Sequence, residues 1–204
     1  MKNVVILLVV CCLLILSGGT NRATAAVHEK LSLVDDFSST SSLWQQQEGE
    51  WVFDLGVVRQ IATKDHYPLI FRIDHKFSNV DVSVDFKPIS GRIDASGGLV
   101  FRAVDKDNYY LVRANALENN FRLYTFKKGT RCYIASAFVT PPSPDKFHTL
   151  RVVAKGDHIQ VFFDGKLYID HHDSSYQKGF VGLWTKADSV TEFDNLVVTE
   201  LPSE

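Results

Sequence analysis

The chain is built largely from short segments in which apolar and polar residues alternate, separated by turn-forming pairs. Residues 80–86 read Val-Asp-Val-Ser-Val-Asp-Phe, so every apolar side chain would point to one face of an extended strand. Pairs such as Gly156-Asp157 and Asp164-Gly165 are typical of tight hairpins. About twelve or thirteen such segments follow one another, and none has a helical apolar period. The pattern predicts an all-β sandwich or barrel.

The first 25 residues have the composition of a signal peptide. Lys2 precedes an unbroken apolar run at residues 4–16, and the segment ends in Ala-Thr-Ala at residues 23–25. The run is shorter than the about 20 residues that span a bilayer, so a retained anchor is the weaker alternative. We predict cleavage after Ala25, a secreted or periplasmic location, and no transmembrane anchor in the mature chain. Residues 26–204 would then form a single domain.

Charge and cysteine content exclude several classes of protein. The 22 basic and 24 acidic residues are well mixed and give a net charge of −2, so nucleic acid is not an expected partner. Cys11 and Cys12 lie in the predicted signal peptide, which leaves Cys132 alone in the mature chain. One cysteine cannot form an internal disulfide, so stability must come from the core.

A series of segments in the expected domain resembles a known family in order and spacing. The segments are Gly49 with Trp51, Ser96-Gly97-Gly98-Leu99-Val100-Phe101-Arg102, Asn108-Tyr109-Tyr110, the two hairpin pairs above, Gly179-Phe180-Val181-Gly182-Leu183-Trp184, and Phe193-Asp194-Asn195-Leu196. Together they are similar to the 3-keto-disaccharide hydrolase family of concanavalin A-like jelly rolls, over about residues 34–199.

This resemblance implies a jelly roll of about twelve strands in two sheets, with the ligand site on one concave sheet face or its rim. It also implies hydrolysis of glucosides that are already oxidised to a ketone at carbon 3. The chain departs from the family pattern in one strand. Larger members tend to carry an acidic residue in the strand that matches residues 109–116, and here that strand has no carboxylate.

The implied reaction requires a base and a group that stabilises negative charge. A ketone at carbon 3 acidifies the proton on carbon 2, so a base can remove it and the group on carbon 1 can leave before water adds. Glu118, in the loop at residues 115–120, is the nearby carboxylate and the catalytic candidate. Arginine or a metal ion could stabilise the oxyanion.

Strand alternation predicts one polar sheet face that carries arginine and tyrosine. If Leu99 and Phe101 face the core, Arg102 faces outward, and the same alternation places Arg122 and Tyr124 outward. Exposed arginines and tyrosines also pair across strands for stability alone, which is the structural alternative. The substrate-binding candidates are Arg102, Tyr109, Tyr110, Arg113, Asn115, Arg122, Tyr124, Trp184 and Lys186.

Two groups of residues suggest a metal ion, and no other cofactor is indicated. Asp35, Asp36 and Asp194 could together hold a divalent metal such as calcium, which prefers oxygen ligands. His171 and His172 could bind a transition metal, but neighbours in a strand point to opposite faces. The remaining histidines show no ligand spacing in the sequence.

The sequence leaves an enzyme and a binding domain as open alternatives. No Glu-x-Asp-x-Glu pattern occurs, which disfavours ordinary hydrolysis by paired carboxylates. A free-standing mature domain favours an enzyme that cleaves 3-keto-glycosides by base-assisted elimination and hydration. The missing strand carboxylate favours a non-catalytic carbohydrate-binding domain or a laminin G-like interaction module. In each sugar-directed case the partner is a carbohydrate or keto-glycoside.

Overall fold

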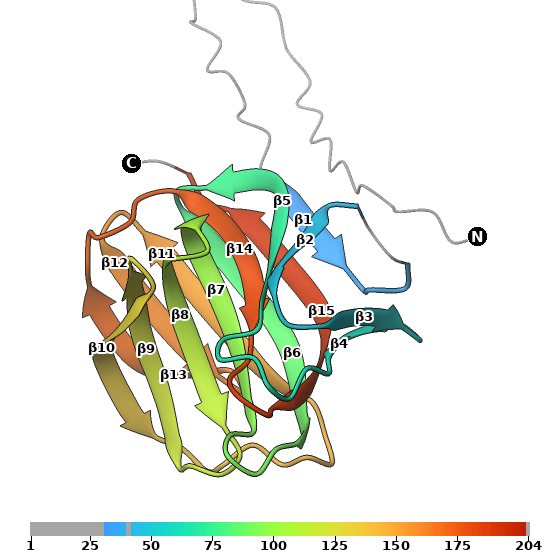
Figure 1. Ribbon diagram of the computed structural model, residues 1–204. Coiled ribbons are helices and arrows are strands. Elements are labelled where there is room, and N and C mark those ends of the chain that lie inside the picture. Colours follow the sequence, from blue (N-terminus) through green and yellow to red (C-terminus); the bar gives the residue numbers. More distant parts are fainter. Residues whose placement is uncertain (1–30, 40–41, 203–204) are drawn as a thin grey trace, which may run out of the picture.

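The computed structural model describes residues 31–39 and 42–202, and this part of the chain contains fifteen strands and no helix. The strands form two antiparallel sheets packed as a sandwich (Figure 1). The predicted all-β fold is therefore confirmed. The predicted signal peptide lies outside the described residues. Within them, no helix has the length and apolar character needed to cross a membrane.

One sheet has eight strands. Its order is β13-β12-β11-β6-β15-β4-β3, and β1 also pairs with β15. The bounds are β1 (Ser32–Asp35), β3 (Trp51–Asp54), β4 (Val57–Gln60), β6 (Val80–Ser90), β11 (His148–Lys155), β12 (His158–Phe163), β13 (Lys166–His172) and β15 (Val190–Glu200).

The other sheet has seven strands in the order β10-β9-β8-β7-β14-β5-β2, and it carries the candidate site. The bounds are β2 (Trp44–Glu48), β5 (Leu69–Phe77), β7 (Ser96–Asp105), β8 (Asn108–Asn115), β9 (Asn120–Lys127), β10 (Thr130–Phe138) and β14 (Gly179–Trp184).

The main core lies between the two sheets and follows the alternation in the sequence. In β6, Val80, Val82, Val84 and Phe86 are fully buried, whereas the residues between them are partly exposed. The sequence did not indicate β2, whose Trp-Gln-Gln-Gln-Glu segment has no apolar alternation. This strand forms because its backbone pairs with β5 at the sheet edge.

Turn chemistry fixes the register of the predicted hairpins. Asp164 and Gly165 both have positive φ angles, 47° and 78°, between β12 and β13. A two-residue turn with both residues in this region matches the twist of the strands it joins, and glycine adopts it without strain. The hairpin predicted from Asp164-Gly165 is confirmed.

Two adjacent glycines in β7 allow side chains to approach the backbone on both faces of the seven-stranded sheet. A Cβ atom on Gly97 would lie 2.2 Å from Cδ2 of Phe86, across the inter-sheet core. A Cβ atom on Gly98 would lie 2.7 Å from Cδ1 of Leu111 and 3.1 Å from Cε3 of Trp184, on the other face. Side chains from other strands therefore pack directly against the backbone of β7 on both of its faces.

Candidate functional site

The outer face of the seven-stranded sheet, which points away from the eight-stranded sheet, brings together the arginines of β8 and β9. Arg113 lies directly opposite Gly98 of β7 and Arg122 of β9, and Trp184 of β14 lies opposite Gly98. Residues directly opposite in antiparallel strands share a face. Arg113, Arg122 and Trp184 thus lie on this outer face, as predicted for Arg122.

A second apolar cluster covers much of this outer face. Tyr109 stacks on Phe126 with ring centroids 4.4 Å apart, and Tyr67 lies 5.0 Å from Phe126 and 5.6 Å from Trp184. Tyr67 comes from the loop before β5 and folds over the strands. We call these rings the outer aromatic cluster: Tyr67, Phe71, Tyr109, Tyr124, Phe126, Phe180 and Trp184.

Tyr109 and Trp184 form the floor of this cluster. Trp184 is fully buried and Tyr109 is 1% exposed. Burial, which disfavours the charged phenolate, raises the pKa of Tyr109 far above its ordinary value. Both substrate-binding candidates therefore lie on the outer face, but they support the surface from beneath.

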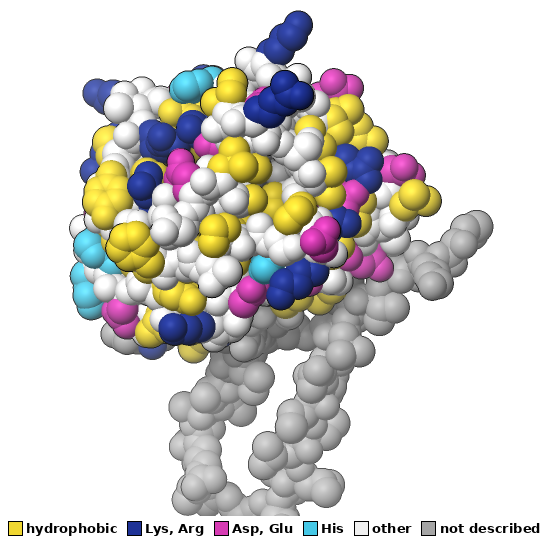
Figure 2. Space-filling model, turned by 90° about the horizontal axis from the view of Figure 1, so that it is seen from below, with side chains coloured by type: hydrophobic (Ala, Val, Ile, Leu, Met, Phe, Trp, Pro, Cys, Tyr) yellow, Lys and Arg dark blue, Asp and Glu magenta, His cyan; other side chains and the backbone are white. Residues whose placement is uncertain are grey.

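Polar side chains gather beside the outer aromatic cluster, at the end of the sheet where β8 ends and β9 begins. Arg113 Nη2 donates to Glu118 Oε2 at 2.9 Å, and Asn120 Nδ2 donates to the same oxygen at 2.7 Å. Lys186 Nζ donates to Asp94 Oδ2 at 2.9 Å. We call this group the rim network: Asp94, Arg113, Glu118, Asn120, Arg122 and Lys186. Figure 2 shows acidic, basic and apolar side chains interspersed on the lower end of the sandwich.

Arg113 is the least exposed cation of the rim network. It is 2% exposed, yet its Nε and Nη1 groups have no acceptor among the described residues. Arg122 Nε and Asp94 Oδ1 are also buried without a partner in that part of the chain. A buried donor without an acceptor costs about 1–3 kcal/mol. Most buried polar groups are satisfied, so a group of exceptions in one place indicates a functional site.

Glu118 is held as a carboxylate. Burial raises its pKa, but the hydrogen bond from Asn120 and the charges of Arg113, Arg122 and Lys186 outweigh burial, so the pKa of Glu118 lies below its ordinary value. A low pKa favours accepting hydrogen bonds over taking a proton. The geometry therefore suits Glu118 to ligand binding better than to the base role predicted for it.

The far side of the rim carries accessible ring surface. Arg122 Nη1 donates to the Tyr124 hydroxyl at 3.3 Å, and Tyr124 is on the outer face as predicted. Arg131 of β10 lies over the Tyr124 ring at 4.9 Å and the Tyr67 ring at 5.6 Å. Tyr133 is 63% exposed next to Tyr124. The Tyr133 ring therefore offers flat apolar surface to a ligand, whereas the Tyr124 ring is 4% exposed and lies beneath Arg131.

The prediction that Arg102 faces outward is wrong. Arg102 is 1% exposed, has a φ angle of 49°, and lies where a bulge shifts the β7–β8 register between Phe101 and Asp105. The bulge interrupts the alternation on which the prediction depended. The guanidinium donates to the carbonyls of Ser78 at 2.8 Å and Tyr176 at 3.2 Å, so Arg102 connects β7 to the loops that contain these two residues.

Tyr110 is also outside the site, whereas Asn115 lies beside Arg113 and its Nδ2 is buried without a partner among the described residues. Tyr110 lies in the inter-sheet core with its ring stacked on Phe101 at 5.0 Å, and its hydroxyl donates to the Asp173 carboxylate. Burial and the bond to Asp173 raise the pKa of Tyr110 to about 12. Asn115 is fully buried, and its Oδ1 accepts from the Leu117 backbone at 2.9 Å. Its role is to shape the turn.

The structure brings the residues of the two suggested metal groups together only in part. Besides burial, the charge of Asp36 raises the pKa of Asp194, so these two carboxylates lie close together. Asp35 accepts from Arg72 at 2.7 Å and from the indole of Trp44 at 2.8 Å, so its carboxylate is already engaged. His171 and His172 lie on opposite faces of β13, as alternation predicts. Cys132, a free thiol, is half-buried in β10.

Sequence reasoning missed four contributors to this surface, namely Tyr67, Asp94, Asn120 and Arg131. Tyr67 and Asp94 come from loops, in which the sequence has no alternation that predicts where a side chain points. Arg131 could have been found, because it alternates with Cys132 and lies opposite Phe126 in the register.

The comparison with known families agrees with this architecture. Residues 31–199 match the family described as the 3-keto-alpha-glucoside-1,2-lyase-like domain. The chain belongs to this family. The match covers nearly all of the described residues and confirms the family predicted from the sequence.

Individual relatives of this lyase-like domain include carbohydrate-related proteins. The levanase of Bacillus subtilis (strain 168) is 29% identical over 164 residues, which cover 78% of this chain and 23% of the levanase. The chain thus spans less than a quarter of that relative. The carbohydrate binding module CBM66 from Bacillus subtilis has a TM-score of 0.68 and 25% identity, over 76% of this chain and 93% of the module.

A more distant structure confirms the fold alone. The Bacillus licheniformis beta-glucanase has a TM-score of 0.61 and 13% identity, over 84% of this chain and 98% of the glucanase. The predicted jelly-roll sandwich is confirmed, and the comparisons support the general prediction of a sugar-directed domain.

Proposed function

We propose that this domain binds carbohydrate at the rim network. The observation that carries the proposal is Arg113, a buried cation whose Nε and Nη1 have no acceptor within the described part of the chain, beside partly exposed polar groups and tyrosine rings. A sugar would supply oxygen acceptors to this region and apolar C–H surface to the rings.

The charges of the rim network suit a neutral sugar better than a polyanion. Arg122 and Lys186 are donors, whereas Glu118 and Asp94 are acceptors. A sugar hydroxyl both donates and accepts, so it can bond to either kind of group. The three cations and two carboxylates of the network nearly balance, so it has little net charge with which to attract a polyanion. Binding sites for small polar ligands commonly combine a few such groups with aromatic walls.

The relatives support this proposal and suggest the first ligand to test. The CBM66 structure is named as a carbohydrate binding module and matches over nearly its whole length. The levanase shares 29% identity with this chain. We therefore take levan as the first polysaccharide probe.

The test is calorimetric titration of the protein with levan. Arg122→Ala and Glu118→Gln should each weaken binding by about tenfold or more, because a hydrogen bond to a charged group contributes about 1.5–3 kcal/mol. Arg151→Ala is the matched control, since Arg151 lies on the opposite sheet and pairs with Asp81. Levan binding that is unchanged in both rim variants would place the site elsewhere.

Cleavage of 3-keto-glycosides is a second candidate, favoured by the family match. Glu118 would take the proton from carbon 2, and the electron pair of that C–H bond would form the enolate. The enolate would then expel the group on carbon 1, which leaves with its bonding electrons, and water would add across the resulting double bond. Arg113, Arg122 and Lys186 lie near Glu118 and would stabilise the enolate oxygen.

The decisive assay for cleavage follows release of the aglycone from a 3-keto-α-glucoside, with and without divalent metal. Release that Glu118→Gln abolishes and Arg151→Ala preserves would support the enzyme. Binding of the glucoside with no release under either condition would assign the domain to binding alone. Release that persists in Glu118→Gln would remove Glu118 as the base.

We also propose that the protein is exported, to the periplasm or outside the cell. The support is the charged start, apolar run and Ala-Thr-Ala ending of residues 1–25. Cell fractionation with sequencing of the mature amino terminus tests this. A chain that keeps residues 1–25 in the cytoplasm would contradict it.

A further inference from the structure

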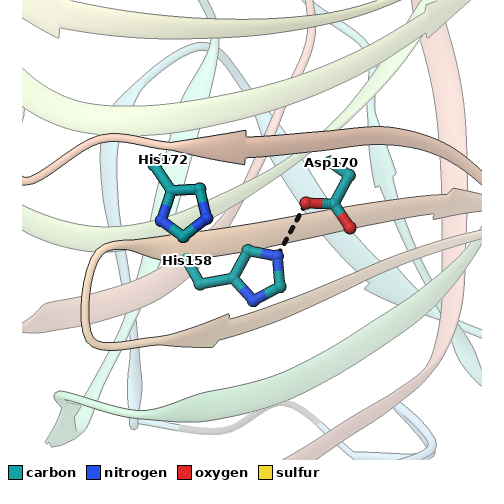
Figure 3. A group of neighbouring side chains, drawn as sticks. All are labelled: His158, Asp170 and His172. Atoms are coloured by element: carbon teal, nitrogen blue, oxygen red, sulfur yellow. Dashed lines mark hydrogen bonds and ion pairs between the residues drawn. The ribbon is translucent and has the colours of Figure 1, made fainter.

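The outer face of the eight-stranded sheet carries a cluster of two histidines and one aspartate. His158 of β12 lies directly opposite His172 of β13, and Asp170 lies one step along the same face, opposite Gln160. Figure 3 shows the three side chains projecting together from this hairpin, which is the edge of the sheet. The hairpin register brings together residues that are distant in sequence.

The potential ligand atoms of this cluster lie close together. One such atom from each of His158, Asp170 and His172 lies within 4.8 Å of the others. The two imidazole rings are stacked with centroids 4.7 Å apart and planes 10° from parallel. In Figure 3, one ring nitrogen of each histidine points toward the Asp170 carboxylate. His158 Nε2 lies 2.7 Å from Asp170 Oδ1.

Neighbouring groups orient two of the three ligands. Asp157 Oδ1 lies 3.1 Å from His172 Nδ1, so this nitrogen is occupied and Nε2 is left for another partner. Gln160 Nε2 donates to Asp170 Oδ2 at 2.9 Å, which leaves Oδ1 directed at His158. Metal-binding histidines usually have their second ring nitrogen bonded to a carboxylate in this way.

We propose that His158 Nε2, His172 Nε2 and Asp170 Oδ1 form a binding site for a divalent transition metal ion, with Zn²⁺ as the test ion. Two imidazoles and one carboxylate are a ligand set of open zinc sites, in which water fills the fourth position. Imidazole excludes Ca²⁺ and Mg²⁺, which prefer oxygen ligands. The ion would take the place of the hydrogen bond between His158 Nε2 and Asp170 Oδ1, and both atoms must be free of protons to bind it.

The proposed ion would join β12 to β13. Because β13 is the last strand of its sheet, one of its sides has no neighbour among the described strands. A metal ion that bridges the two strands would hold this edge hairpin in register. This role is independent of the rim network, which lies on the other sheet.

The test is calorimetric titration of the untagged protein with ZnCl₂. We expect one saturable Zn²⁺ site per chain. Loss of a residue that only orients a ligand, such as Asp157, typically lowers metal affinity by roughly 10–100-fold. His158→Ala and His172→Ala each remove a ligand, so each should lower the Zn²⁺ affinity by more than this. His75→Ala is the matched control, because the His75 and His158 side chains are exposed to the same degree, 37% and 39%. The control should bind Zn²⁺ as the parent protein does.

A second measurement does not depend on variants. In a long-range ¹H–¹⁵N spectrum, Zn²⁺ should shift the Nε2 resonances of His158 and His172 and leave His75 unchanged. Absence of saturable binding in the parent protein would overturn the proposal. So would Zn²⁺ affinity that is the same in the parent, His158→Ala and His172→Ala proteins.

Discussion

The two outer faces of this sandwich are built differently, although both point away from the shared core. The outer face of the seven-stranded sheet buries a second layer of rings and the guanidinium of Arg113. On the eight-stranded sheet, side chains such as Arg151 and Asp81 form a partly exposed ion pair at 2.7 Å. An exposed pair of this kind contributes about 0–1 kcal/mol.

The outer face of the seven-stranded sheet thus rests on a buried layer of its own, whereas most side chains on the outer face of the eight-stranded sheet are in contact with solvent. A carbohydrate site needs polar groups held in fixed positions, and the outer aromatic cluster supplies the rigid floor for the rim network. The eight-stranded sheet keeps the alternation of buried and exposed residues expected for a face in water. Three pairs of variants test whether the two faces differ in this way.

The largest expected difference lies in the rings of the two outer faces. Phe126→Ala should reduce the free energy of unfolding by about 3–5 kcal/mol, because Phe126 is 1% exposed and its loss leaves a cavity between Tyr109 and Tyr67. Phe162→Ala, on the eight-stranded sheet, should cost no more than about 1.5 kcal/mol, because this ring is partly exposed. Urea unfolding measures both. Equal losses would show that the outer aromatic cluster is not a second core.

The fold follows largely from local patterns, which is why the sequence predicts it well. Alternation in β6 and the Asp164-Gly165 turn each depend on a few neighbouring residues. The same reasoning failed for Arg102, because a bulge reverses the direction of its side chain and nothing nearby in the sequence marks it.

The candidate site could be predicted only in part. Arg122 and Glu118 lie where alternation and loop position put them. Tyr67 and Asp94 reach the site from loops, so their direction depends on the tertiary fold. His158 and His172 become neighbours only through hairpin register, so spacing along the chain gave no metal signal.

The second comparison concerns the two ion pairs. Glu118→Ala should cost about 1–3 kcal/mol of unfolding free energy, because it leaves the buried Arg113 without its carboxylate. Asp81→Ala should cost about 0–1 kcal/mol, because Arg151 then returns to water. Guanidinium unfolding of the two variants provides the measurement. A larger loss in Asp81→Ala would reverse the assignment of the two faces.

The smallest effect is a difference in pH dependence between Glu118 and Asp194. The folded pKa of Glu118 lies below its ordinary value of 4.5, so its carboxylate stabilises the fold above about pH 4.5. That contribution should be lost as the pH falls through the lower folded pKa. The free energy of unfolding of the parent protein should exceed that of Glu118→Gln at neutral pH, and this difference should shrink as the pH falls below 4.5. Unfolding measurements on both proteins at each pH test this.

Asp194 of β15 should show the opposite sign. Burial raises its pKa above the ordinary 3.8; a hydrogen bond from the Asn195 backbone opposes this, and the charges of Asp85 and Asp36 add to it. The charged form thus disfavours folding at neutral pH. Asp194→Asn should therefore be more stable than the parent protein at neutral pH, and the gain should vanish as the pH falls below 3.8. A destabilised variant at neutral pH would contradict this.

The position of β15 has a consequence for the order in which the protein can assemble. This strand is the last in the described chain, yet it lies between β6 and β4 and also pairs with β1. Until β15 is synthesised, β1, β3 and β4 have no partner that joins them to the rest of their sheet. Such distant pairings slow folding, and they leave the unpaired edges of β6 and β4 open to other chains meanwhile. The eight-stranded sheet is therefore completed only after residues 190–200 have left the ribosome, when β15 takes its place between β6 and β4.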